Sequence, residues 1–220
     1  MDSGAITKPK FASFAEIFAR SAVIAVVTLP DAALAIPVAR ALARGGVKTL
    51  EITLRTPAGL EAIRRIASGV PEILVGAGTV LRPDDMSAAI DAGAAFTISP
   101  GATPALLAAG RTASVPYLPG VGTASELMAG LDEGYDCFKL FPVMAMSGAL
   151  LPRILGGPFP RVRFCCNGGV ALMSSCELLA EPNVFAVGAG WLTPPEALAA
   201  ENWEAIENLA RAATKTLRKA

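Results

Sequence analysis

The sequence is organised around the stretch Asp136-Cys137-Phe138-Lys139-Leu140-Phe141-Pro142, in which residues 137–141 are apolar except for one lysine. Residues 137–141 have the composition of a buried strand, and Pro142 marks its end because proline cannot donate to a sheet ladder. Lys139 would then lie near the carboxyl end of a strand, where parallel α/β proteins place their chemistry. Burial disfavours the ammonium form of a lysine, and a neutral amine attacks carbonyl carbons to give a Schiff base. The alternative is a lysine that reaches the surface or pairs with a carboxylate.

Similar apolar runs recur along the chain, roughly every 23 residues, which is close to the length of one strand-helix unit. About eight such units in 220 residues predict an α/β fold, a single (β/α)8 TIM barrel, and a doubly wound open sheet is the alternative. No linker divides the chain, so residues 1–220 are predicted to form one domain, with a loose segment at 1–10. The runs begin near Ala22, Thr49, Ile73, Ala95, Val115, Asp136, Val162 and Val184, and the fifth of the predicted strands is expected to end at Pro119-Gly120.

Helix-start signals and amphipathic stretches fill the spaces between these runs. Proline after a capping residue is the recurrent signal, as in Thr56-Pro57, Arg82-Pro83 and Thr103-Pro104. An extra N-terminal helix is predicted over 13–20, where apolar residues recur at helical spacing. The other predicted helices cover 32–43, 57–68, 83–93, 104–110 and 202–217, with one more that is capped by Thr123 or Ser125 and ends before Gly130.

The composition excludes several functional classes. Nineteen basic residues balance nineteen acidic ones, which argues against a nucleic-acid surface or a polybasic membrane patch. The chain has no histidine, so it has no Ser-His-Asp or Cys-His triad and lacks the commonest transition-metal ligand. The spacing of its four cysteines fits neither a zinc site nor a disulfide scaffold, which together with the absence of a signal pattern predicts a cytoplasmic protein. No membrane span is predicted, because the longest uncharged run, 92–110, contains Ser, Thr, Gly and two prolines.

Two charged side chains stand in apolar runs and would meet inside such a barrel. A carboxylate such as Glu51, within 49–53, is costly to bury unless it has a partner or a task. Glu51 and Lys139 are therefore expected either as a buried ion pair or as an acid/base beside a nucleophile. Arg55 is suited to clamp a substrate carboxylate, and its alternative is an ordinary surface arginine.

Polar residues or glycine pairs follow other predicted strands. The hydroxyl of Thr79 either shares the substrate carboxylate with Arg55 or caps the following turn. Gly168-Gly169 either presents backbone N–H groups to an anion such as phosphate or forms an ordinary tight turn.

Several separate motifs, in order along the chain, give a resemblance to a known family. Between about residues 22 and 215 the chain resembles the class I 2-keto-3-deoxy-6-phosphogluconate (KDPG) aldolases, a family that also includes 4-hydroxy-2-oxoglutarate (KHG) aldolases. The motifs are Glu51-Ile52-Thr53-Leu54-Arg55-Thr56, Gly76-Ala77-Gly78-Thr79-Val80, Ile98-Ser99-Pro100-Gly101, Phe138-Lys139-Leu140-Phe141-Pro142, and Arg163-Phe164-Cys165 before Gly168-Gly169.

The resemblance implies a (β/α)8 barrel, usually a homotrimer, that needs no metal or other cofactor. It implies that Lys139 forms the Schiff base and that Glu51 is the general acid/base. It further implies that the substrate carboxylate binds Arg55 and Thr79 and that Pro100 and Phe141 line the pocket.

The departures from the family pattern lie on the side that holds the phosphorylated aldehyde. The family usually has threonine before the glycine pair, where this chain has Asn167 before Gly168 and Gly169. It often has serine or threonine before a tryptophan after the eighth strand, as a phosphate ligand, where this chain has Gly190. The usual Phe-Pro-Ala-Glu after the lysine is here Phe141-Pro142-Val143-Met144.

The function that this resemblance implies is a Schiff-base aldolase that cleaves KDPG to pyruvate and glyceraldehyde 3-phosphate. A second enzyme hypothesis keeps the chemistry and changes the substrate to 4-hydroxy-2-oxoglutarate or an unphosphorylated 2-keto-3-deoxy sugar acid. A third hypothesis, from a different class, is a non-catalytic barrel that binds a phosphorylated metabolite. The lysine and its expected partners argue against the third, because pure binding needs no buried lysine.

Overall fold

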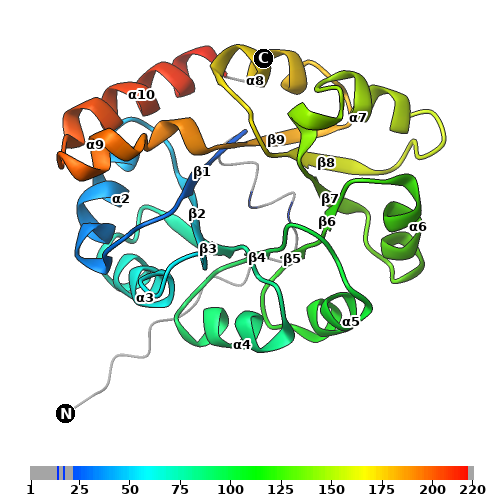
Figure 1. Cartoon of the computed structure of the whole chain (residues 1–220), viewed down its shortest axis with the longest axis horizontal. Coiled ribbons are helices and arrows are strands. Elements are labelled where there is room, and N and C mark those ends of the chain that lie inside the picture. The colour runs from blue at the N-terminus through cyan, green and yellow to red at the C-terminus, as the bar shows by residue number, and fades with distance from the viewer. Residues whose placement is uncertain (1–13, 15–16, 18–21, 218–220) are drawn as a thin grey trace.

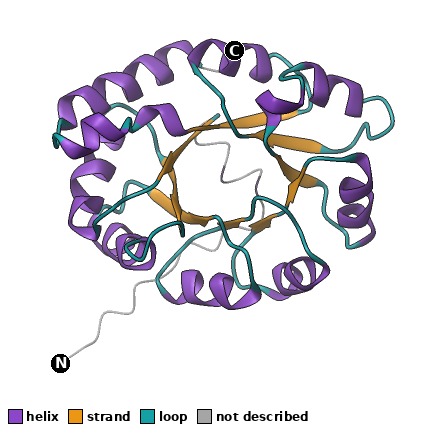
Figure 2. Ribbon diagram, viewed as in Figure 1, coloured by secondary structure: helices purple, strands orange, loops and turns teal. Residues whose placement is uncertain are grey.

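The computed structural model describes Phe14, Ile17 and residues 22–217, and in it the strands form a ring that helices surround (Figures 1 and 2). The strand pairings are parallel and follow the order β5-β4-β3-β2-β1-β9-β8-β7-β6. The strands are β1 (Val23–Val27), β2 (Thr49–Thr53), β3 (Leu74–Gly78), β4 (Thr97–Ile98), β5 (Tyr117–Leu118), β6 (Gly120–Val121), β7 (Cys137–Leu140), β8 (Arg163–Cys166) and β9 (Val184–Ala189).

The ring closes through one interrupted strand. β5 pairs with β4, β6 pairs with β7, and only Pro119 separates the two pieces. Proline has no N–H to give to a ladder, but its carbonyl still accepts a hydrogen bond from the Lys139 N–H at 2.9 Å. The pieces therefore act as the fifth strand of a (β/α)8 barrel, which confirms the predicted fold over the open sheet. The prediction that this strand ends at Pro119-Gly120 is wrong, because pairing resumes at Gly120 and continues to Val121.

Helices lie on the outside of the ring, between successive strands (Figure 2). The predicted Thr103-Pro104 start is confirmed, because the Thr103 hydroxyl accepts a hydrogen bond from the Leu106 N–H and Pro104 is the first helical residue. The predicted start at Thr56-Pro57 is wrong: the helix begins at Gly59, and the Thr56 hydroxyl instead donates to the Leu29 carbonyl at 2.6 Å. The helices are α2 (Ala35–Arg44), α3 (Gly59–Gly69), α4 (Pro83–Asp91), α5 (Pro104–Thr112), α6 (Ala124–Asp132), α7 (Leu150–Leu155), α8 (Leu172–Leu179), α9 (Pro195–Ala199) and α10 (Trp203–Thr216), with the 3-10 turns η1 (Ala32–Leu34), η2 (Val143–Met146) and η3 (Gly190–Leu192).

The lower interior of the barrel is apolar. Its buried side chains come from strands on opposite sides of the ring, so they can meet only inside it. A second, larger cluster joins the strands to the surrounding helices. Most of the predicted N-terminal helix, 13–20, lies outside the described residues, but Phe14 and Ile17 are described, and both are buried in the interior cluster. The cluster consists of Phe14, Ile17, Ile24, Leu74, Phe96, Ile98, Leu118, Cys165, Phe185 and Ala186.

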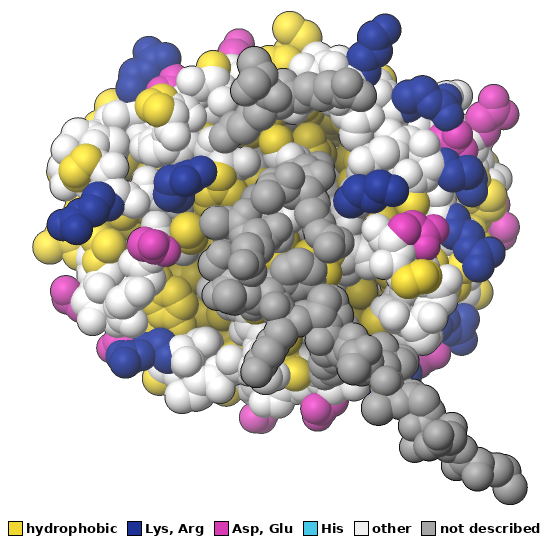
Figure 3. All heavy atoms as spheres, turned by 180° about the vertical axis from the view of Figure 1, so that it is seen from behind, with side chains coloured by type: hydrophobic (Ala, Val, Ile, Leu, Met, Phe, Trp, Pro, Cys, Tyr) yellow, Lys and Arg dark blue, Asp and Glu magenta, His cyan; other side chains and the backbone are white. Residues whose placement is uncertain are grey.

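The surface charges and the helix lengths bear on the predictions about a nucleic-acid surface and a membrane span. On the face shown in Figure 3, the lysine and arginine side chains are interspersed with aspartate and glutamate rather than gathered in a block. None of the helices within the described residues combines the length and apolar composition that crossing a membrane requires.

Candidate active site

The centre of the site is a pair of oppositely charged side chains inside the barrel. Lys139 on β7 and Glu51 on β2 lie 88 residues apart in sequence, yet Lys139 Nζ is 3.2 Å from Glu51 Oε1. The side chains are 4% and 0% exposed, so both charges are withdrawn from water. An ion pair at this depth gains little net stability, because the cost of desolvation offsets the Coulomb attraction. The structure thus brings together the two residues that the sequence singled out.

Glycine at position 78 provides the space for the Glu51 carboxylate. A Cβ atom at this position would lie 1.9 Å from Glu51 Oε1, so any larger residue would collide with it. The second oxygen, Glu51 Oε2, is buried and makes no hydrogen bond to another described residue. An unsatisfied buried polar atom costs about 1–3 kcal/mol, and this oxygen has the capacity to accept a hydrogen bond from a bound molecule.

The surroundings of Lys139 are mainly apolar. Its Nζ lies 5.4 Å from the centre of the Phe141 ring, and its register neighbours on β6 and β8 are Gly120 and Cys165. Burial raises the pKa of the Cys165 thiol well above its usual value, with a further contribution from Cys166. The thiol therefore stays protonated, and it donates a hydrogen bond to Asn167 Oδ1 at 3.2 Å. Lys139 is the nucleophile that this arrangement favours, not the adjacent cysteine.

Arg55 and Thr79 meet at the rim of the barrel. Arg55 Nε donates a hydrogen bond to Thr79 Oγ1 at 3.1 Å, and the N-cap of the following helix, α4, is Arg82 rather than Thr79. Thr79 has φ 59°, a left-handed conformation that is unfavourable for a β-branched residue. Strain of this kind is typical of functional sites. The structure brings Arg55 and Thr79 together, and a shared carboxylate site on them stays a prediction.

The loop after β8 is held against the loop after the lysine strand. The N–H groups of Val143 and Met144 donate to the carbonyls of Asn167 and Gly168, at 2.8 and 3.2 Å. Gly168 has φ 95°, and a Cβ there would lie 2.8 Å from Pro142 Cα, so conformation and space both require glycine. The N–H groups of Gly168 and Gly169 form no hydrogen bond to another residue within the described part of the chain. They are left as donors for an anion.

Asn167 is the first residue of that loop, but its side chain lies inside the barrel. It is 3% exposed, its Oδ1 accepts the Cys165 thiol, and its Nδ2 occupies the space that a side chain on residue 188 would need. A Cβ on Gly188 would lie 1.9 Å from Asn167 Nδ2. The asparagine therefore faces the same interior as Lys139, one layer above Cys165.

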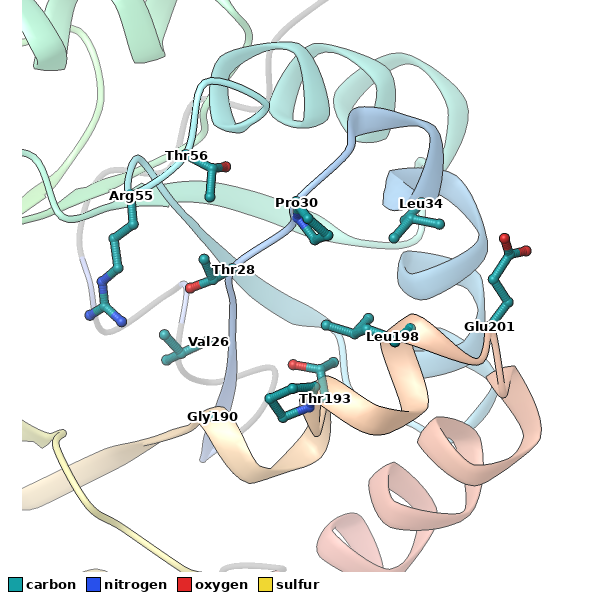
Figure 4. A pocket seen from close by; sticks show the side chains of 12 residues that line it. Val26, Thr28, Pro30, Leu34, Arg55, Thr56, Gly190, Thr193, Leu198 and Glu201 are labelled. Carbon is teal, nitrogen blue, oxygen red and sulfur yellow. The ribbon is translucent and has the colours of Figure 1, made fainter.

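Pro100 and Gly190 complete the set of predicted residues. Pro100 follows β4, and its carbonyl carbon would lie 2.3 Å from a Cβ on Gly120, so the fourth and fifth strands approach closely here. Gly190 follows β9, where an added Cβ would meet only the Val26 carbonyl oxygen, at 3.9 Å. Gly190 and Arg55 line a cavity of about 590 Å³ that extends from the barrel rim to α9 (Figure 4). We call this cavity the side chamber; its walls come from residues 26–34, Arg55, Thr56 and residues 190–201.

No group of three or more cysteine, aspartate or glutamate side chains gathers as a metal site among the residues that the structure describes.

The family model described as "KDPG and KHG aldolase" matches residues 14–209 of the chain. The chain belongs to this aldolase family. The resemblance inferred from the motifs is thereby confirmed.

Relatives and solved structures in the family match nearly the whole chain. The 2-dehydro-3-deoxy-phosphogluconate aldolase of Pseudoalteromonas atlantica is 41% identical over 208 residues, 94% of this chain and 97% of the relative. The KHG/KDPG aldolase of Escherichia coli (strain K12) is 44% identical over 193 residues, 88% of this chain and 91% of the relative. The crystal structure of the KDPG aldolase of Legionella pneumophila, with pyruvate captured as a covalent carbinolamine, has a TM-score of 0.87, with 43% identity and coverage of 90% of this chain and 96% of that one.

Sequence reasoning missed several residues of this aldolase-family site. Ser99 is buried, its hydroxyl is 2.6 Å from the Tyr117 hydroxyl, and it accepts the Gly120 N–H at 3.2 Å. This network fixes the backbone beside Pro100. The hydrogen bond from Cys165 to Asn167 and the whole side chamber were also missed. The signal that could have found Cys165 was its position two residues before Asn167, since alternate residues of a strand share a face.

Proposed function

We propose that this protein is a Schiff-base aldolase that cleaves KDPG to pyruvate and glyceraldehyde 3-phosphate, with Lys139 as the nucleophile. The observation that carries the proposal is the buried pair of Lys139 and Glu51, 3.2 Å apart at the carboxyl-terminal side of the barrel. Relatives named for this activity support it, at 41–44% identity over most of the chain. The proposed catalytic residues are Lys139 and Glu51.

The reaction begins when Lys139 Nζ attacks the C2 keto carbon of the substrate. Glu51 moves protons so that the carbinolamine loses water and becomes an iminium ion. Glu51 then takes the proton of the C4 hydroxyl, and the C3–C4 bond breaks as its electrons flow into the iminium. The aldehyde leaves, and the enamine of pyruvate remains on Lys139. Protonation at C3 and hydrolysis of the iminium release pyruvate and free the amine.

The remaining residues bind the two ends of the substrate in this proposal. The guanidinium of Arg55 and the hydroxyl of Thr79 hold the C1 carboxylate, and their mutual hydrogen bond of 3.1 Å places both at one point of the rim. Pro100 and the Phe141 ring line the space around the keto carbon. The N–H groups of Gly168 and Gly169 bind the phosphate, with Asn167 and the Gly190 region beside them.

A second candidate function is the aldol cleavage of 4-hydroxy-2-oxoglutarate or of an unphosphorylated sugar acid. The observation that favours it is Gly190, which offers no hydroxyl where the family often provides one for phosphate. A rate comparison across keto acids with and without phosphate separates the two functions.

Reductive trapping tests the first step. Borohydride added with pyruvate should attach one pyruvate-derived adduct per chain, and peptide mapping should place it on Lys139. Lys48 is a matched control: half-buried, but on the loop before β2. An adduct on another lysine would overturn the assignment, and no adduct at all would favour the non-catalytic barrel.

We also propose that the protein assembles as a homotrimer in the cytoplasm. Several large apolar side chains around α7 and α8 are exposed, which is typical of an interface between subunits. The thiols of the four cysteines are free, as in a reducing compartment. Light scattering coupled to size exclusion measures the mass of the assembly, and a monomer across the micromolar range would contradict the first part. The exposed side chains are Met144, Leu150, Ile154 and Met173.

A further inference from the structure

We propose that the side chamber binds the tail of neutral, apolar aldehydes, so that the enzyme also joins pyruvate to such aldehydes in the aldol direction. This inference rests on the proposed Schiff-base function, because the chamber supplies only a binding site for the second reactant. The chamber's volume of about 590 Å³ falls within the range of small-molecule sites.

The inner end of the chamber lies beside the strand that carries Glu51, although neither Glu51 nor Lys139 lines the chamber. Val26 lines the chamber and is the register neighbour of Glu51 on the adjoining strand. Arg55 also lines it and bonds to Thr79. Gly190 stands at the same end, and because it has no side chain it leaves this opening wide. An aldehyde whose carbonyl lies beside Glu51 can therefore extend its tail into the chamber.

The lining of the chamber selects for an apolar tail. Half of its twelve lining residues have apolar side chains, and Figure 4 shows Val26, Pro30, Leu34 and Leu198 among them; the other two are Pro195 and Ala199. Burial of apolar groups against such a wall is favourable, because it removes apolar surface from water.

The polar lining differs between the two ends of the chamber: the Arg55 guanidinium at the inner end attracts an anion, whereas the outer end carries the Glu201 carboxylate, and the Thr193 hydroxyl also lines the cavity. The Thr28 hydroxyl is 2.8 Å from the Thr53 hydroxyl, and the Thr56 hydroxyl donates to a backbone carbonyl, so both are already engaged. Figure 4 shows Glu201 and Arg55 on opposite sides of the lining. The Glu201 carboxylate repels phosphate and carboxylate at the outer end, whereas a neutral tail is unaffected by it.

The bond-forming step balances without any further reagent. C3 of the enamine on Lys139 attacks the aldehyde carbon, and the electron pair of the carbonyl bond moves to its oxygen. That oxygen takes a proton from Glu51, and water hydrolyses the iminium to release the amine. The product is a 4-hydroxy-2-oxo acid whose alkyl tail lies in the chamber.

A series of straight-chain aldehydes, from propanal to hexanal, tests the inference. With saturating pyruvate, kcat/KM for aldol addition should rise about fourfold for each added CH₂, which corresponds to about 0.8 kcal/mol. A flat dependence on chain length in the wild-type protein would overturn the inference.

Variants that fill the chamber test whether the dependence of kcat/KM on aldehyde chain length arises there. Ala199→Trp fills the chamber from α9 and should flatten the dependence on chain length, while KDPG cleavage changes by no more than about twofold. Ala200→Trp is the matched control, because Ala200 is the next residue, is exposed and does not line the chamber. Leu34→Trp fills the chamber from the opposite wall and serves if Ala199→Trp does not fold. If kcat/KM still rises with aldehyde chain length in blocking variants that fold, the inference is overturned.

A wrong assignment of the chamber and a wrong assignment of the catalytic residues predict different experimental results. If KDPG is cleaved and Lys139 is trapped by pyruvate, but hexanal reacts no faster than propanal, only the chamber assignment is wrong. If no adduct forms and KDPG is not cleaved, both proposals are overturned.

Discussion

Replacing Gly78 with alanine should inactivate the enzyme by moving Glu51. A Cβ on residue 78 would lie 1.9 Å from Glu51 Oε1 and 2.5 Å from its Cδ, whereas real Cβ contacts essentially never fall below 3.0 Å. The carboxylate must therefore shift by about 1 Å or more, away from its 3.2 Å contact with Lys139. A misplacement of about 1 Å can cost on the order of 10²-fold, and complete loss of a general acid/base costs about 10²–10⁴-fold. The turnover of KDPG should fall within that range.

The backbone does not explain this loss, because Gly78 is not among the glycines with positive φ and alanine can adopt its conformation. Overpacking should lower the free energy of unfolding by about 1–3 kcal/mol. For a chain of this size, each kcal/mol lowers Tm by about 2–4 °C, which a thermal melt followed by circular dichroism measures. The turnover is measured by coupling the release of pyruvate to the oxidation of NADH by lactate dehydrogenase.

Gly76→Ala is the matched control, since Gly76 lies on the same strand and a Cβ there would meet Phe96 Cε2 at 2.3 Å. This variant should lose similar stability but keep its turnover within about threefold, because Phe96 lies in the apolar interior below the site. In a Glu51→Ala background, Gly78→Ala should cost almost no further stability, since the side chain that it strikes is gone. A Gly78→Ala protein with wild-type turnover would refute the reasoning, because it would mean that the carboxylate works from another position.

Three further predictions follow from the site. Glu51→Gln keeps the shape of the side chain and removes the proton acceptor, so the turnover of KDPG should fall about 10²–10⁴-fold with a smaller change in KM; near-normal turnover would make the carboxylate structural. Gly190→Ser restores a hydroxyl in a position that has room for it, and kcat/KM for KDPG should rise by about tenfold or more while that for 4-hydroxy-2-oxoglutarate stays nearly constant. Activity should survive excess EDTA because a lysine is the electron sink, and inhibition that added metal reverses would contradict this.

The strand positions were predictable because each strand is a short apolar run bounded by glycine or proline. All eight predicted starts lie within two residues of a strand in the structure. The fifth strand was mispredicted at its end because proline is normally a strand breaker, yet the carbonyl of Pro119 still accepts a hydrogen bond from Lys139. The Thr56-Pro57 signal failed for a similar reason, since a tertiary hydrogen bond from the Thr56 hydroxyl to Leu29 replaced the expected cap.

The central pair of the site was predictable, whereas the side chamber was not. Glu51 and Lys139 stand out because a charge within an apolar strand is rare, so each is conspicuous in the sequence alone. The chamber has no such signal, because its apolar wall consists mainly of ordinary prolines, leucines and an alanine, and most of its lining comes from two segments far apart in the chain, residues 26–34 and 190–201. Only the closure of β1 against β9 brings these segments together.

The position of the site within the barrel explains how the fold supports a costly pair of charges. Below Glu51 and Lys139, the interior is filled by apolar side chains such as Phe96 and Ile98, which are fully buried. That layer stabilises the ring independently of the charges, so the upper layer need not contribute to stability. Removing one member of a buried pair usually costs about 3–5 kcal/mol, whereas replacing both by apolar residues is often neutral. Proton transfer at a Schiff base therefore explains why both charges are retained above the apolar layer better than the stability of the barrel does.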